Sequence, residues 1–103
     1  MIEKSIETYL KRKCEKNALV CLKLTSFAGV PDRIILGKDL ALLLELKTDD
    51  GVIRPRQKVN IKRLRTFGIL AGVVDSKEQI DKIFELIKAK KLNERSLNEI
   101  CIF

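Results

Sequence analysis

Two short motifs hold the side chains best suited to chemistry. Asp32 follows a proline, and thirteen positions later comes Glu45, with Lys47 two positions beyond it. Successive side chains of a β-strand point to opposite faces, so Glu45 and Lys47 would project together from one strand. If Asp32 begins the preceding strand, a short hairpin through Gly37 brings its carboxylate beside that of Glu45. The sequence therefore predicts two acids and one lysine in one place.

This trio suits phosphodiester hydrolysis. Two facing carboxylates repel each other unless a cation lies between them. Mg²⁺ takes oxygen ligands and is often held by one or two carboxylates with water and phosphate oxygens. It would polarise a scissile phosphate and lower the pKa of an attacking water, which Lys47 would orient. The alternative is that Glu45 and Lys47 form an exposed surface pair worth roughly 0–1 kcal/mol.

The composition narrows the classes of protein that fit. The 103 residues are enough for one domain, and the absence of histidine excludes Ser-His and Cys-His triads and HExxH metalloproteases. A net charge of +7 suggests a polyanionic partner, although a basic protein without one also fits. Three cysteines without a CxxC pair, no signal segment and no long apolar run predict an intracellular protein that does not span a membrane.

The elements that must position the trio can be read from hydrophobic spacing. Apolar residues at helical spacing predict a helix over residues 2–16, and a helix from Pro55 to Gly68 has proline at its start and glycine at its end. A capping box at residues 76–79 begins another helix. Strands are expected over residues 19–25, 32–36, 40–47 and 69–74. The order αβββαβα implies an α/β fold in which a mixed sheet has helices on both faces.

Two segments are less direct to interpret. Residues 40–47 are rich in leucine, a helix former, but their length and the flanking turns favour a central strand that is apolar on both faces. Residues 93–103 are apolar enough to pack on the body of the protein or on a second subunit, and their structure is left open.

With these motifs in order, the sequence resembles a known family. Pro31-Asp32 with Glu45-Leu46-Lys47 matches the PD-(D/E)XK nuclease signature, and the longer run over residues 3–76 is similar to the VRR-NUC family, the virus-type replication-repair nucleases. The resemblance implies a single nuclease domain over residues 1–103 with a restriction-endonuclease-like αβββαβ core. It also implies Mg²⁺- or Mn²⁺-dependent DNA cleavage, with Asp32, Glu45 and the backbone carbonyl of Leu46 as metal ligands.

The resemblance also carries expectations about partners. Stand-alone members resemble Holliday-junction resolvases, so we expect branched DNA as substrate, a homodimer, and a phage or bacterial setting. The rival hypothesis is a non-catalytic nucleic-acid-binding module that keeps the nuclease fold, which the intact acid pair disfavours. A sequence-specific restriction-type enzyme is a weaker alternative, because 103 residues leave little room for a recognition domain.

Two more polar residues are candidates for the site. The family places an acid in the first helix, and at 100° per residue Glu3 lies ~55° and Glu7 ~95° from the centre of the apolar arc. Glu3 is therefore favoured, although both acids would also suit a solvated first turn. Gln57 lies on the apolar stripe of its helix with Ile61 and Leu64, and the family has a glutamine here that faces the metal. Alternatively, this amide caps the helix start.

Basic residues accompany these candidates. They recur at i, i+4 and i+7 on the outer face of the same helix, where like charges destabilise an isolated helix and a phosphate backbone is a credible partner. A solvated helix face is the alternative. The candidate DNA-binding residues are Lys23, Arg54, Arg56, Lys58, Lys62 and Arg65.

Overall fold

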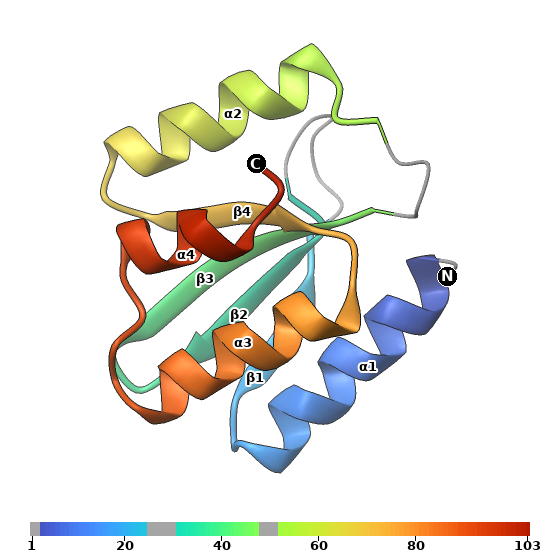
Figure 1. Ribbon diagram of the computed structural model, residues 1–103, viewed down its shortest axis with the longest axis vertical. Helices are drawn as coiled ribbons and strands as arrows, with labels where there is room; N and C mark the ends of the chain where they lie inside the picture. The colour runs from blue at the N-terminus through green and yellow to red at the C-terminus, as the bar shows by residue number, and fades with distance from the viewer. Residues whose placement is uncertain (1–2, 25–30, 48–51) are drawn as a thin grey trace.

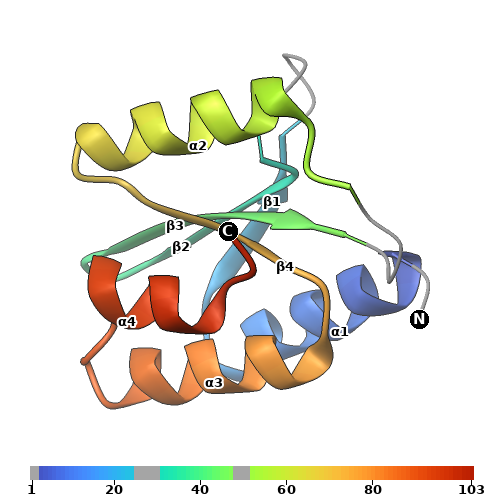
Figure 2. The same ribbon diagram turned by 45° about the horizontal axis from the view of Figure 1, so that its top comes forward.

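The computed structural model describes residues 3–24, 31–47 and 52–103, without the side chains of residues 3 and 4. One four-stranded sheet lies between helices (Figure 1). Helix α2, Pro55–Thr66, covers one face, whereas α1, Glu3–Lys16, and α3, Lys77–Lys88, cover the other (Figure 2). The turn expected before Pro31 and the start of the loop after Lys47 lie outside the described residues.

The sheet is mixed, as its sequence order requires. Its strands are β1, Val20–Lys23; β2, Arg33–Gly37; β3, Leu40–Leu46; and β4, Leu70–Val74, in the order β1-β2-β3-β4. Antiparallel hairpin pairing joins β1, β2 and β3, and β4 returns parallel to β3 after the α2 crossover. The leucine-rich segment is thus a central strand, as predicted, and it is hydrogen-bonded to β2 on one side and to β4 on the other.

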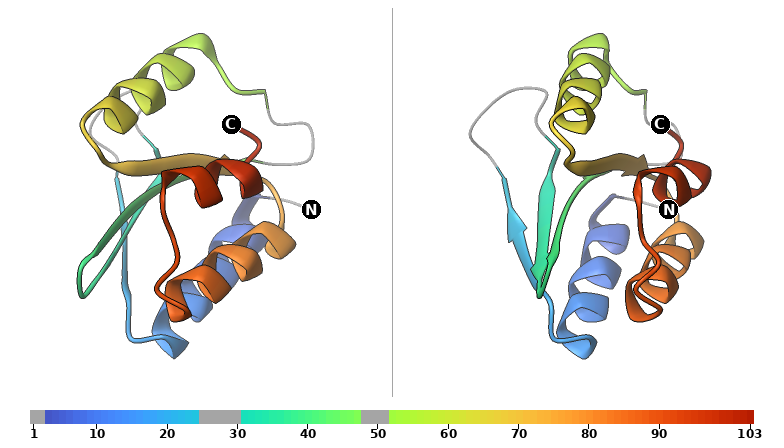
Figure 3. Two further views of the ribbon diagram at one scale, coloured as in Figure 1. Left: turned by 60° about the vertical axis from the view of Figure 1, so that its left-hand side comes forward. Right: turned by 90° about the vertical axis from the view of Figure 1, so that its left-hand side faces the viewer.

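The larger core lies between the sheet and α1 and α3. Leu42, Leu44 and Leu46 point into it from β3, where all three are buried. They pack with apolar residues of both helices, among them Ile6, Leu10, Cys14, Ile80, Ile83 and Phe84. Figure 3 shows the two helices lying together on this side of the sheet, away from α2.

The termini of α2 follow from its sequence. Pro55 occupies the first turn, where its missing N–H leaves no hydrogen bond unmade. At the other end Gly68 adopts a φ of 82°, and its N–H donates to the Arg65 carbonyl while the N–H of Ile69 donates to the Leu64 carbonyl. This left-handed glycine ends the helix, as the sequence predicted.

The segment left open by the sequence forms α4, Glu94–Ile100, and packs on the body of the protein. The Asn93 side chain accepts a hydrogen bond from the Ser96 N–H and begins the helix. Leu97 is buried in the larger core, and the Gln79 amide donates to the Ile100 carbonyl at 3.2 Å. Within the described residues, no helix is long and apolar enough to cross a membrane.

Candidate active site

The alternation of β3 places its polar residues on the α2 face. Leu43 packs in a smaller core beneath α2, whereas its neighbours Leu42 and Leu44 belong to the larger core. Glu45 shares the face of Leu43, and its side chain contacts Gln57 of α2. The predicted projection of this acid away from the leucine core is therefore present.

Asp32 and Glu45 lie side by side. The backbone N–H of Asp32 donates to Glu45 Oε1 at 3.1 Å, and the N–H of Leu46 donates to Asp32 Oδ2 at 3.4 Å. Both contacts follow from the β2–β3 register, which pairs Arg33 with Leu44 and so places the preceding residue opposite Glu45. The hairpin brings the two predicted acids together, and each carboxylate contacts the backbone that carries the other.

Glu45 also binds the two other polar residues expected here. Its Oε2 accepts a hydrogen bond from Gln57 Nε2 at 3.0 Å and lies 3.3 Å from Lys47 Nζ. Gln57 Oε1 meanwhile accepts the backbone N–H of Arg54 at 3.1 Å. One end of the Gln57 amide thus caps α2, as one of the two alternatives predicted, and the other end contacts Glu45.

The environment of Glu45 favours a cation. The residue is only 4% exposed. Burial first, and the nearby charge of Asp32 second, raise the pKa of its carboxyl, while the Lys47 ammonium opposes the rise. A buried carboxylate with a raised pKa and an acidic neighbour is the environment that a bound cation stabilises.

The donor atoms fit a small, hard ion. Two carboxylates are the protein ligands that Mg²⁺ commonly uses, with the remaining positions left to water and phosphate. In an extended strand the N–H and C=O of one residue point to the same side. Since the Leu46 N–H faces Asp32, its carbonyl faces the same side. Among the described residues, no group of three or more acidic or cysteine side chains could hold a metal.

Comparison with known proteins agrees with this geometry. No known family profile matches the chain, and no curated protein matches it by sequence. A solved structure described as "VRR_NUC domain" superposes with a TM-score of 0.74 and 28% sequence identity, covering 81% of this chain and 94% of that one. This likeness supports an assignment of the chain to the VRR-NUC family. It shows a restriction-endonuclease-like α/β fold and supports a nuclease-family domain.

The two acidic residues expected in the first helix have separate surroundings. Glu7 Oε1 lies 2.7 Å from Arg33 Nη2, and Arg33 is only 5% exposed on the face of the sheet that α1 covers. Glu7 is thus paired with Arg33 on the face of the sheet opposite to Glu45. The Glu3 side chain lies outside the described residues. The sequence analysis missed Arg33, although its position two residues before the inward-pointing Ile35 signals a buried charge.

Four of the six basic candidates are exposed on α2 or at its start. Arg54 and Arg56 are exposed at the start of α2, next to Gln57. Lys58 and Lys62 are exposed, and their ammonium groups lie 5.8 and 5.9 Å from the Phe103 ring centroid. These exposed positions are compatible with the predicted DNA contacts.

Arg65 and Lys23 differ from the expectation of a single outward basic face. The guanidinium of Arg65 turns inward, where Nε donates to the Ala71 carbonyl at 3.0 Å, and its carbon lies 5.3 Å from the Phe103 ring centroid. Lys23 pairs with Arg33 in the β1–β2 register and therefore shares the sheet face of Arg33, opposite to the face of Glu45. The structure thus brings neither residue to the acids.

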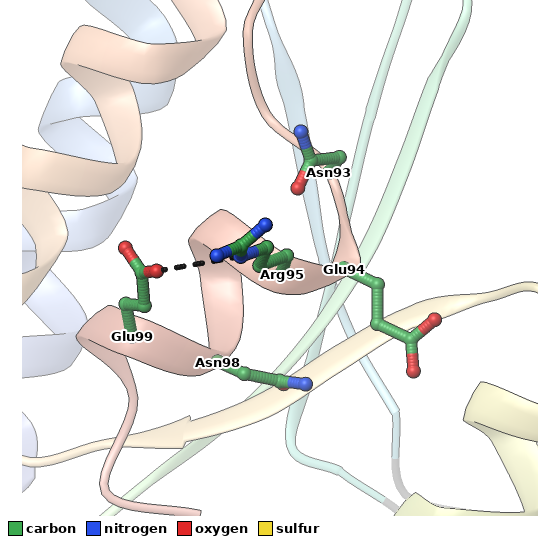
Figure 4. Close-up of a pocket in the computed structure, with 5 residues that line it drawn as sticks. All are labelled: Asn93, Glu94, Arg95, Asn98 and Glu99. Atoms are coloured by element: carbon green, nitrogen blue, oxygen red, sulfur yellow. Dashed lines mark ion pairs between the residues drawn. The ribbon is translucent and has the colours of Figure 1, made fainter.

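An open hollow on the surface lies away from this site. Its lining consists of Asn93 and four residues of α4, with Arg95 and Glu99 forming an exposed ion pair at 3.9 Å (Figure 4). None of these residues contacts Asp32, Glu45 or Lys47 in the described part of the chain. The hollow therefore has no part in the site.

Proposed function

We propose that the domain is a metal-dependent DNA endonuclease that hydrolyses phosphodiester bonds in branched DNA, in the manner of a Holliday-junction resolvase. The observation that carries the proposal is the single cluster in which Glu45 contacts Asp32, Lys47 and Gln57. Acids held together against their mutual repulsion have no evident structural benefit, but they suit an ion that binds phosphate.

The proposed cofactor is Mg²⁺ or Mn²⁺, held by Asp32, Glu45 and the Leu46 carbonyl. When bound, it supplies Lewis-acid polarisation of the scissile phosphate and a lower pKa for the attacking water. Lys47 holds that water in line or compensates the charge that grows on the phosphate oxygens. Gln57, which donates to Glu45 Oε2, would keep the Glu45 carboxylate in one orientation for holding the ion.

The proposed substrate sets the assembly. A four-way DNA junction is two-fold symmetric, so its resolution by two cuts calls for a C2 homodimer with two active sites. Leu97 packs in the core of its own chain, so only the other residues of the C-terminal segment remain available to the candidate interface. Light scattering at micromolar concentration tests this part, and a purely monomeric protein would contradict the resolvase form of the proposal.

Cleavage of labelled four-way junction, flap and linear duplex DNA tests the activity. With Mg²⁺ or Mn²⁺ the wild type should cut the junction fastest, and chelation by EDTA should stop cutting. Glu45→Ala should lower the rate at least about 10³-fold, because it removes a proposed ligand and the partner of Lys47 at once.

A matched control separates chemistry from general damage. Glu85→Ala removes an exposed acid of α3, on the opposite side of the sheet, and should cut at the wild-type rate. Tight DNA binding by the wild type without cutting under either metal would replace the enzyme proposal by the binding-module hypothesis.

A further inference from the structure

The segment that follows α4 lies against the free edge of β4. The N–H of Ile102 donates to the Val73 carbonyl at 2.9 Å, and the N–H of Val73 donates to the Phe103 carbonyl at 3.2 Å. Gly72 permits this approach, since a Cβ there would lie 2.5 Å from Cys101 Sγ. Backbone pairing therefore fixes the place of Phe103.

This pairing aligns Phe103 with the active site. Val73 is directly opposite Glu45 in the β3–β4 register, so Glu45, Val73 and Phe103 form one row across the sheet. Phe103 packs in the smaller core under α2. Neighbouring strands lie about 4.8 Å apart, which puts the Phe103 backbone roughly 10 Å from that of Glu45.

Three cations of α2 gather at this ring. The distances to the ring centroid are 5.8 Å for Lys58 Nζ, 5.9 Å for Lys62 Nζ and 5.3 Å for the Arg65 guanidinium carbon. Helix α2 contains no acid, and within the described part of the chain no ion pair neutralises either lysine. The cations repel one another, but the negative face of the Phe103 ring attracts each of them.

We propose that Phe103 is a positioning residue that holds Lys58 and Lys62 ready to bind backbone phosphates beside the scissile one. This inference rests on the proposed nuclease function and assigns Lys58 and Lys62 to the binding of the DNA substrate. A free lysine side chain loses much rotamer freedom when it binds a phosphate, and a cation–π contact made beforehand reduces that loss.

The test compares Phe103→Leu, which keeps an apolar side chain, with Phe103→Tyr, which keeps the aromatic face. Affinity for a labelled four-way junction is measured by fluorescence anisotropy in EDTA over a range of salt concentrations. Phe103→Leu should raise Kd about three- to tenfold and reduce the slope of log Kd against log salt by about one to two, because each lost phosphate contact removes roughly 0.9. Phe103→Tyr should match the wild type in both.

A double-mutant cycle decides whether the ring acts through the lysines. In a Lys58→Gln, Lys62→Gln background, Phe103→Leu should change neither Kd nor slope further. In the cleavage assay Phe103→Leu should raise KM and leave kcat unchanged. Provided that the wild type cleaves DNA, any of three results would overturn the inference. Phe103→Leu could weaken binding equally in both backgrounds, or it could bind with wild-type affinity. Alternatively, Phe103→Tyr could bind as weakly as Phe103→Leu. A wild type that neither binds nor cuts DNA would overturn the proposed function as well.

Discussion

The two faces of the sheet differ in what they bury. The face under α1 and α3 holds a large apolar core, and the buried charge of Arg33 on this face is paired with Glu7. The face under α2 has a small core, and two carboxylates and one lysine lie at its edge beneath a helix without acids. The contrast indicates that one face mainly stabilises the fold, while the other carries unbalanced charges that a metal ion and a polyanion would neutralise.

Adjacent leucines of β3 offer the largest test of this contrast. Leu44→Ala opens a cavity in the closed core and should lower the free energy of unfolding by about 3–5 kcal/mol. Leu43→Ala, on the α2 face, should cost about 2–3 kcal/mol, because the smaller core can close over the gap. Chemical denaturation measures both, and equal losses would mean that the two faces contribute alike.

The buried ion pair gives an intermediate effect. Glu7→Gln leaves the Arg33 guanidinium in the interior without an opposite charge and should cost about 2 kcal/mol, less than for a fully buried pair because Glu7 is partly exposed. Glu85→Gln, on the exposed side of α3, should change stability by less than about 0.5 kcal/mol.

The cleavage rates of Glu3→Gln and Glu7→Gln distinguish the roles of the two acids in α1. If Glu3 is the acid of the site, Glu3→Gln should impair cleavage, whereas Glu7→Gln should act mainly through stability. Unchanged stability with lost cleavage in Glu7→Gln would instead make Glu7 the acid of the site.

The smallest predicted effect is a gain in stability, whereas the preceding substitutions are expected to lower it. Without metal, Asp32→Asn relieves the repulsion on Glu45 and should stabilise the protein by about 1 kcal/mol at pH 7.5. Because the pKa of Glu45 is raised in the folded protein, its ionisation costs stability as pH rises through that value. The gain should therefore shrink as pH falls and Glu45 becomes protonated. Thermal melts in EDTA at pH 7.5 and 4.5 measure it, and a destabilised variant at pH 7.5 would contradict the account.

The sequence predicted what depends on short-range periodicity. The two-residue alternation of Glu45 and Lys47, the proline and glycine that bound α2, and the hairpin that returns Asp32 to Glu45 are all local in the chain. Gln57 was found for the same reason, since a polar residue on an apolar helical stripe must meet a polar partner.

The features that the sequence did not predict depend on contacts between segments that are distant in the chain. Helical spacing placed Arg65 on an outer face, but it could not reveal that Phe103 returns to lie against Arg65. The side of the sheet that Lys23 faces required the β1–β2 register. Pairing of Arg33 with Glu7 likewise joins two elements whose packing no single window of sequence contains.

Gln57 limits the amino acids that its position can accept. Glutamate would keep the acceptor for the Arg54 N–H but would add a third carboxylate beside Glu45, and lysine would keep a donor but lose the acceptor. Asparagine has both groups but is one methylene shorter, so it cannot span the two contacts from the same backbone. In a library that samples all amino acids at this position and selects for cleavage, glutamine should be the residue recovered.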